Sequence, residues 1–196
     1  MIVVIAPEQS VENEQLWINR LFENGLDLFH IRKYGCCDDV MQKYITAIDK
    51  QFRNQLVLHS HFHLAADLGI KRLHFSEEDR VQKNHLPFQG DYTISTAVHS
   101  IKDFNKLDPK WDYAFFSPVF PSISKPGYGV ENNVLDKLRY KNNSTVQLIG
   151  LGGIDENNFH TTIEAGADGI ALLGSIWQRE NILTTFLKCK QIDQLL

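Results

Sequence analysis

The sequence alternates eight short apolar runs with longer polar stretches, and this alternation most restricts how the chain folds. The apolar runs, each predicted as a β-strand, are Ile2–Ile5, Leu26–Ile31, Leu56–Leu58, Arg72–Phe75, Thr93–Thr96, Tyr113–Phe116, Gln147–Gly150 and Gly169–Leu173. Strands that alternate with helices form parallel sheets, because a crossover must return the chain before each new strand begins. Eight such units predict an α/β protein with a closed (β/α)8 barrel, the TIM-barrel fold.

The segments between the strands carry helical signals. They are Glu12–Phe22, Asp38–Phe52, Phe62–Leu68, Val81–Leu86, Ile101–Asn105, Val134–Tyr140, Glu156–Glu164 and Ile176–Cys189. The second of them has apolar residues at helical spacing, and the fourth is the weakest. Asp155 and Ser175 are expected to cap the last two helices, and Gly166 is expected to end the seventh in a left-handed turn.

The chain is predicted to form one domain over residues 1–196, because no linker or low-complexity segment divides it. A (β/α)8 barrel usually takes about 250 residues, so every connection must be short. The net charge of −4 argues against a general nucleic-acid surface, which needs clustered cations.

Apolar runs and cysteines indicate the compartment. No run approaches the roughly 18 apolar residues of a membrane helix, and Met1–Pro7 is predicted to be a first strand and not a signal peptide. Cys36, Cys37 and Cys189 suit neither a disulfide framework nor a zinc site. We expect free thiols in a reducing cytoplasm, with no membrane partner.

Two glycine-rich segments follow the last two predicted strands, Gly150–Ile154 and Leu172–Ile176. In barrels of this type, the loops after the seventh and eighth strands commonly hold a phosphate group with backbone N–H groups and a helix N-terminus. Glycine allows the anion to approach the backbone. The predicted phosphate-binding residues are Gly152, Gly153, Leu173 and Gly174. The alternative is that both segments only make tight turns.

The loop after the sixth strand combines hydroxyl groups, a cation and glycines. Ser122, Ser124 and Lys125 lie in it. A loop of this composition at the end of a barrel strand is able to close over an anionic substrate and exclude water. We therefore expect these three residues to bind substrate, although a surface turn is the alternative.

Two further strand ends carry residues suited to chemistry. His99 follows the fifth strand, and a histidine there is able to carry protons near neutral pH or simply to cap the next helix. Arg32 and Lys33 follow the second strand. Strand alternation places His30 and Arg32 on one face and Lys33 on the other. Arg32 is suited to bind a carboxylate or a phosphate.

These segments resemble the thiamine-phosphate synthase and thiazole tautomerase (TenI-like) superfamily. The resemblance is carried by Phe29–Lys33, Leu56–Asp79, Ala97–Ser100, Phe116–Lys125 and Leu148–Ile176. They cover most of the barrel in the order of the family. The resemblance implies a cytoplasmic enzyme of thiamine biosynthesis that binds a small phosphorylated thiazole and forms a homodimer.

The residues that a synthase needs are only partly present. The synthase joins hydroxymethylpyrimidine diphosphate to thiazole phosphate with the help of magnesium. Its Asn-Asp pair falls on His59 and Ser60, its second-strand lysine on Tyr34, and its fifth-strand serine on Ala97. The magnesium-binding aspartate is kept as Asp79. Because magnesium prefers hard oxygen ligands, the metal and diphosphate end of the site is altered.

The tautomerase branch matches better. It aromatises a carboxylated thiazole phosphate without a metal, and its Val-His-Ser motif matches Val98–Ser100, which makes His99 the catalytic residue. Arg32, Lys33, Ser122, Ser124 and Lys125 would bind the substrate. The first alternative is a synthase that holds Mg²⁺ through Asp79, and the second is a barrel that binds a phosphorylated ligand without catalysis. No cofactor is expected for the tautomerase.

His59, His61 and His63 raise the possibility of a zinc site. Their spacing of two would place them on one face of a strand. The third strand is expected to end near Ser60, however, and a helix is expected from Phe62. The three side chains should therefore diverge, which argues against metal binding by this set.

Overall fold

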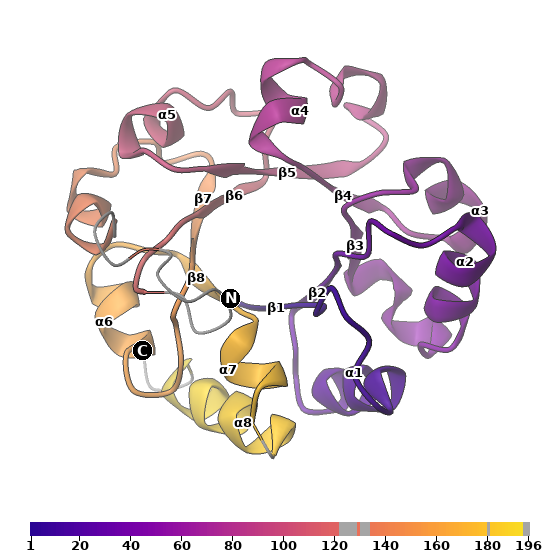
Figure 1. Cartoon of the computed structure of the whole chain (residues 1–196). Helices are drawn as coiled ribbons and strands as arrows, with labels where there is room; N and C mark the ends of the chain where they lie inside the picture. Colours follow the sequence, from indigo (N-terminus) through magenta and orange to yellow (C-terminus); the bar gives the residue numbers. More distant parts are fainter. Residues whose placement is uncertain (122–128, 130–133, 180, 194–196) are drawn as a thin grey trace.

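The structure, a computed structural model, describes residues 1–121, 129, 134–179 and 181–193 and shows a closed barrel of eight parallel strands (Figure 1). The strands are β1 (Ile2–Ile5), β2 (Leu28–Ile31), β3 (Leu56–Leu58), β4 (Arg72–Phe75), β5 (Thr93–Val98), β6 (Tyr113–Phe116), β7 (Gln147–Leu151) and β8 (Gly169–Leu172). Each strand pairs with the next one in the sequence, and β8 pairs with β1 to close the ring. The predicted (β/α)8 barrel is confirmed.

Helices surround the ring of strands (Figure 1). The α-helices are α1 (Glu14–Glu23), α2 (Asp38–Thr46), α3 (Ala65–Leu68), α4 (Glu77–Val81), α5 (Ile101–Asn105), α6 (Phe159–Glu164), α7 (Gly174–Trp177) and α8 (Ile182–Asp193). The 3-10 helices are η1 (Lys50–Gln55), η2 (Phe62–Leu64), η3 (Leu86–Phe88) and η4 (Leu135–Tyr140). Among the described residues, none of these helices has the length and apolar character required to cross a membrane.

Two predicted helices are placed differently by local hydrogen bonds. The helix expected over Val81–Leu86 instead precedes it as α4, because Ser76 and Asp79 form a reciprocal capping box that starts the helix at Glu77. The single helix expected over Ile176–Cys189 is divided into α7 and α8.

The expected caps of the last two helices are wrong. Ser175 lies inside α7 and is buried, so it does not cap the helix. Asp155 accepts a hydrogen bond from the backbone N–H of Asn157, and α6 begins only at Phe159. Gly166 has a φ of 117° and follows Ala165, the C-cap residue of α6, which confirms the expected left-handed turn.

Strand alternation gives the barrel two separate apolar layers. One layer lies inside the ring and consists of Val3, Ile5, Leu28, Val57, Tyr113, Phe115, Ile149 and Ala171. The larger layer lies between strands and helices and includes Val4, Phe29 and Phe116. Neighbouring residues of a strand point to opposite faces. The inner-layer residues nearest the carboxyl ends of the strands, Ile5 and Phe115, therefore line the opening of the barrel at that end.

Three aspartates form hydrogen bonds with the backbone at the opposite, amino-terminal rim. Asp27, Asp112 and Asp168 each stand one residue before a strand and accept a hydrogen bond from the preceding strand of the sheet. The donors are the backbone N–H groups of Ile2, Ile94 and Leu148, at 2.6, 2.9 and 2.7 Å. These carboxylates satisfy backbone donors that the sheet leaves unpaired at its end.

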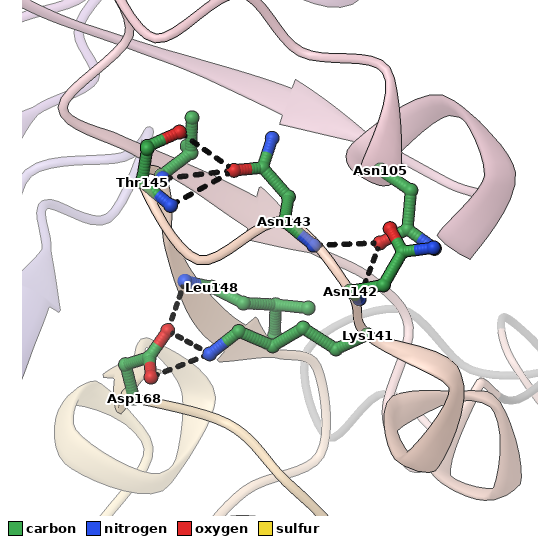
Figure 2. Close-up of polar contacts among 8 residues, drawn as sticks. Asn105, Lys141, Asn142, Asn143, Thr145, Leu148 and Asp168 are labelled. Atoms are coloured by element: carbon green, nitrogen blue, oxygen red, sulfur yellow. Dashed lines mark hydrogen bonds and ion pairs between the residues drawn. The ribbon is translucent and has the colours of Figure 1, made fainter.

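Figure 2 shows this arrangement around Asp168, which contacts the backbone N–H of Leu148 and the ammonium group of Lys141. The same view shows two asparagines that hold the segment before β7. Asn105, the last residue of α5, accepts from the backbone N–H of Asn142, and Asn143 accepts from the hydroxyl of Thr145. The turn that contains Asp168 is therefore structural, as its helix-to-strand position in the sequence indicates.

Lys33 belongs to the outer layer and not to the mouth of the barrel. Its Nζ lies 3.0 Å from Oε2 of Glu14, and both side chains are buried. The hydroxyl of Tyr44 donates to the other oxygen of Glu14 at 2.5 Å. Burial and the neighbouring Glu14 raise the pKa of Tyr44 well above its ordinary value, so the phenol stays a donor. This placement corrects the expectation that Lys33 binds substrate.

We predict that Glu14→Gln destabilises the fold by about 3–5 kcal/mol, because it leaves the buried ammonium of Lys33 without a counter-charge. Urea unfolding measures the free energy. Glu164→Gln is the matched control: Glu164 is exposed and pairs with His160, so its loss should cost less than about 1 kcal/mol. Equal losses in the two variants would contradict the role of the buried pair.

Candidate active site at the carboxyl ends of the strands

A cavity of about 670 Å³ opens at the carboxyl ends of the strands. Its lining comes from the ends of all eight strands and from the segments that follow them: Ile5, Arg32, Tyr34, His59, His74, Ser76, Glu77, Glu78, Val81, Gln82, Ala97, His99, Phe115, Ser117, Leu151 and Leu173. Two other cavities, of about 710 and 640 Å³, lie at the amino ends of the strands. TIM-barrel enzymes place their chemistry at the carboxyl end, so the first cavity is the candidate site.

His99 stands at this mouth with one ring nitrogen already engaged. Its Nδ1 lies 2.9 Å from the carbonyl oxygen of Ser117, which only accepts hydrogen bonds, so Nδ1 carries the proton. In the neutral ring, Nε2 is then unprotonated and able to accept a proton. His99 does not cap α5, because the side chain of Ser100 does so by accepting from Asp103 N–H.

Arg32 brings an unused donor to the same cavity. Its nearest carboxylate is that of Glu8, at 3.7 Å from Nη2. Its Nε is buried and has no hydrogen-bond partner among the described residues. Buried polar atoms are rarely left unpaired. Arg32 lines the cavity, and the binding of an anionic group by this residue stays a prediction.

The two glycine-rich loops meet at the cavity. Leu173 lines it, and Gly174 begins α7 directly behind. A side-chain carbon on Gly153 would lie 2.2 Å from the carbonyl oxygen of Pro121, so this glycine is required by packing against the loop after β6. Ser175 Oγ is buried without a partner in the described part of the chain. Phosphate binding by Gly152, Gly153, Leu173 and Gly174 stays a prediction.

Three other expected residues, Ser122, Ser124 and Lys125, lie outside the described residues.

Asp79, the expected magnesium ligand, is committed to its own helix. One carboxylate oxygen accepts from the backbone N–H and the hydroxyl of Ser76, and the other accepts from Asn84. Burial would raise the pKa of Asp79, but the hydrogen bonds from Ser76 and Asn84 outweigh it and keep the pKa below its ordinary value. Asp79 does not line the cavity, whereas its neighbours Glu77 and Glu78 do.

The three histidines after β3 do not gather at one point, but of the predicted divergence only the separation of His59 is found, because His61 and His63 both lie beside Asp38. His63 lies 2.9 Å from Asp38 and His61 accompanies it on the outside of the barrel. His59 turns inward, where its ring stacks on that of His74 at 4.3 Å between centroids. His59 also contacts His30 through a hydrogen bond of 2.9 Å between Nε2 and Nδ1.

This inner cluster of His30, His59 and His74 was not expected from the sequence. The available signal was parity: these residues occupy inward positions on or just after β2, β3 and β4, which are neighbours in the ring. Burial lowers the pKa of His30 and of His59 well below the ordinary value, and nearby His74 adds to the effect. Burial also lowers the pKa of His74 to about 3. All three rings are neutral at neutral pH.

We predict that the cluster makes the fold sensitive to acid. An unfolded histidine binds a proton near pH 6.5, whereas the folded cluster resists protonation to a lower pH. The unfolded chain therefore binds more protons below about pH 6.5, so stability is full above that pH and falls on acidification toward 3, where His74 titrates. Each histidine contributes up to about 1.4 kcal/mol per pH unit.

Urea unfolding in metal-free buffer between about pH 7 and pH 5 tests this slope. His74→Gln should flatten it by up to about 1.4 kcal/mol per unit, while the exposed control His160→Gln should leave it unchanged. The same slope in wild type and His74→Gln would show that His74 is not held neutral by the fold.

The sequence model of the family described as thiamine monophosphate synthase (TMP-TENI) matches residues 2–176. The thiamine-phosphate synthase of Anoxybacillus flavithermus is 27% identical over 155 residues, which cover 78% of this chain and 69% of that protein. The thiamine-phosphate synthase of Bacillus velezensis is 23% identical over 172 residues, covering 84% of this chain and 77% of that protein.

Solved structures give the same match across the barrel. A thiamine phosphate pyrophosphorylase from Bacteroides thetaiotaomicron has a TM-score of 0.79 and 25% identity, covering 100% of this chain and 98% of that one. A thiamine phosphate pyrophosphorylase from Pyrococcus furiosus has a TM-score of 0.78 at 19% identity, covering 99% and 95%. At that lower identity the second match supports the fold alone.

Proposed function

Because the chain belongs to the thiamine monophosphate synthase/TenI family, we propose that it is an enzyme that binds a phosphorylated thiazole in the cavity at the carboxyl ends of its strands. The relatives are named as synthases, which supports an enzyme and favours the transferase over the tautomerase that the sequence resemblance put first. The side chains at the cavity instead favour the tautomerase.

The activity that the geometry supports best is the isomerisation of a carboxylated thiazole phosphate to its aromatic form. The supporting observation is the position of His99 at the cavity, where its Nδ1–H is held by Ser117 and its Nε2 has no hydrogen-bond partner among the described residues. The isomerisation removes a proton from the ring and delivers one to the exocyclic carbon. A single positioned base serves both steps, so no proton is gained or lost overall.

Arg32 complements His99 in this proposal. Its buried Nε, which has no partner in the described part of the chain, and its place in the cavity lining suit it to bind the substrate carboxylate. The phosphate would lie at the loops of Gly152, Gly153, Leu173 and Gly174, next to Ser175, whose hydroxyl also has no partner among the described residues. The two anionic ends of the substrate would then be held on different sides of the ring that reacts.

The synthase is the second candidate, and the relatives' names are the observation that favours it. Its difficulty is the release of diphosphate, which develops negative charge that magnesium and basic side chains must neutralise. Asp79 is occupied by its capping box, and Tyr34 and His59 stand where the family has a lysine and an amide. Among the described residues, Glu77 and Glu78 are the carboxylates that line the cavity and would have to replace Asp79 as magnesium ligands, although Glu77 already pairs with Arg80.

We predict that His99→Gln keeps the fold and the binding of thiazole phosphate but lowers turnover about 10²–10⁴-fold, the usual contribution of a positioned acid–base group. Ultraviolet absorbance follows the aromatisation of the ring. The exposed histidine variant His160→Gln should have wild-type turnover. Wild-type turnover in His99→Gln would remove His99 from the mechanism.

We also predict that the protein does not form thiamine phosphate at a useful rate. The assay supplies hydroxymethylpyrimidine diphosphate and thiazole phosphate over a range of magnesium and enzyme concentrations. The expected result is a rate that does not rise with enzyme. Magnesium-dependent product formation in proportion to enzyme would contradict the tautomerase proposal and establish the synthase.

A further inference from the structure

One side of the barrel interior is polar, directly below the cavity. The interior of such barrels is usually filled with Val, Ile and Leu. Here the inward residues of β2 to β6 include His30, His74, Ser95 and Tyr113, and His59 joins them just after β3. None of the five is more than 8% exposed. Burying so many polar groups is unfavourable unless partners satisfy them, and this requires a physical explanation.

One nitrogen of each imidazole is held by a hydroxyl group. The contacts are His30 Nε2 to Tyr113 Oη at 2.8 Å, His59 Nδ1 to Tyr34 Oη at 3.3 Å, and His74 Nδ1 to Ser95 Oγ at 2.9 Å. Hydroxyl oxygens accept N–H donors. Histidines that bind metals almost always have the second ring nitrogen held in this way, which fixes the tautomer and the orientation of the ring.

The other ring nitrogens of His30 and His59 face each other, and the ring of His74 lies against both rings. His30 Nδ1 and His59 Nε2 are 2.9 Å apart. His74 Nε2 has no hydrogen-bond partner among the described residues, and one ligand nitrogen from each ring lies within 4.8 Å of the others. A tetrahedral zinc ion with bonds of about 2.0–2.1 Å would hold such nitrogens about 3.4 Å apart, so His30 Nδ1 and His59 Nε2 would have to separate and the stacked rings of His59 and His74 would have to rotate.

We propose that His30, His59 and His74 form a three-histidine site for one divalent transition-metal ion, with zinc the leading candidate. Three imidazoles are the ligand set of zinc, cobalt or nickel and not of magnesium, which requires oxygen ligands. The site is therefore distinct from a magnesium site at Asp79. It also does not depend on the proposed isomerisation, because binding of the ion requires no substrate.

The site would keep an open coordination position. His59 and His74 line the cavity, so an ion held by them has access from that side, whereas His30 closes it below. Three protein ligands with an open fourth position are typical of catalytic zinc. The fourth ligand would be a water molecule or an oxygen atom of a ligand bound in the cavity.

Proton positions are consistent with such a site. A metal ligand must present a lone pair, and burial keeps the rings neutral by lowering the pKa of His30 and His59, and that of His74 to about 3. On metal binding, the proton between His30 Nδ1 and His59 Nε2 would leave that nitrogen, and the same ring would carry a proton on its other nitrogen instead. That N–H would donate a hydrogen bond to the neighbouring tyrosine hydroxyl. Binding therefore releases no proton from the cluster at neutral pH.

Nearby charges act in both directions. The guanidinium of Arg32 lies close enough to lower the pKa of His59, and that of Arg72 acts on His30, so both oppose a cation. Burial lowers the pKa of His74, and the charge of Asp79 offsets part of this lowering. Glu77 and Glu78 line the cavity. These three carboxylates favour the binding of a cation. The ion would be held chiefly by the three nitrogen ligands.

The test uses the full chain, stripped of metal with a chelator and then titrated with Co²⁺. The expected result is one Co²⁺ per chain with the intense visible bands of a four- or five-coordinate ion, displaced by Zn²⁺ but not by Mg²⁺. No binding by wild-type protein, or only the weak bands of a six-coordinate ion, would overturn the proposal and leave the cluster a hydrogen-bonded network.

Variants locate the ion. His30→Gln, His59→Gln and His74→Gln should each lower the affinity for Zn²⁺ at least about 100-fold, since even outer-shell changes cost about 10–100-fold. His63→Gln is the matched control, a histidine from the same segment that lies outside the barrel beside Asp38. Loss of binding in His63→Gln with no loss in the three cluster variants would overturn the assignment.

Tyr113→Phe provides a milder variant in case the cluster variants do not fold. It removes only the hydroxyl that holds His30 Nε2 and should lower the affinity about 10–100-fold. Circular dichroism verifies that each variant is folded. Unchanged affinity in folded Tyr113→Phe would count against His30 as a ligand. Because the readout is metal binding without substrate, the result is separate from the test of His99.

Discussion

Closure of the barrel is the constraint on which the rest of the structure depends. The pairing of β1 with β8, with Ile2 opposite Ile170 and Val4 opposite Leu172, joins the two ends of the sheet. Once the ring is closed, every second residue of each strand must fit inside it. The same closure places the ends of all eight strands around one mouth, so residues far apart in the sequence, such as Arg32 and Leu173, line one cavity.

The two rims of the barrel have different tasks. At the amino-terminal rim, Asp27, Asp112 and Asp168 are used to satisfy backbone N–H groups of neighbouring strands. At the carboxyl-terminal rim, Arg32 Nε and Ser175 Oγ are buried without partners among the described residues. Unsatisfied donors are costly where no ligand will pair with them. Arg32 also lines the cavity, where an anionic ligand would pair with its Nε.

Membership in the family fixes the scaffold more firmly than the chemistry. The barrel is shared with relatives of about a quarter identity, yet function resides in the particular side chains at the site. His59 and Tyr34 now belong to a hydrogen-bonded group that reaches down to His30 and Tyr113 inside the ring. These residues are thus integrated into the interior of the barrel.

The sequence by itself determined the eight strands, their parallel order and the shared face of His30 and Arg32, because alternation along a strand is a local property. It also located His99 and the two glycine-rich turns. Only the tertiary structure decided that Lys33 pairs with Glu14, because that contact joins two distant segments across the outer layer. It likewise brought His74 onto His59, since the register between β3 and β4 depends on how the whole ring closes.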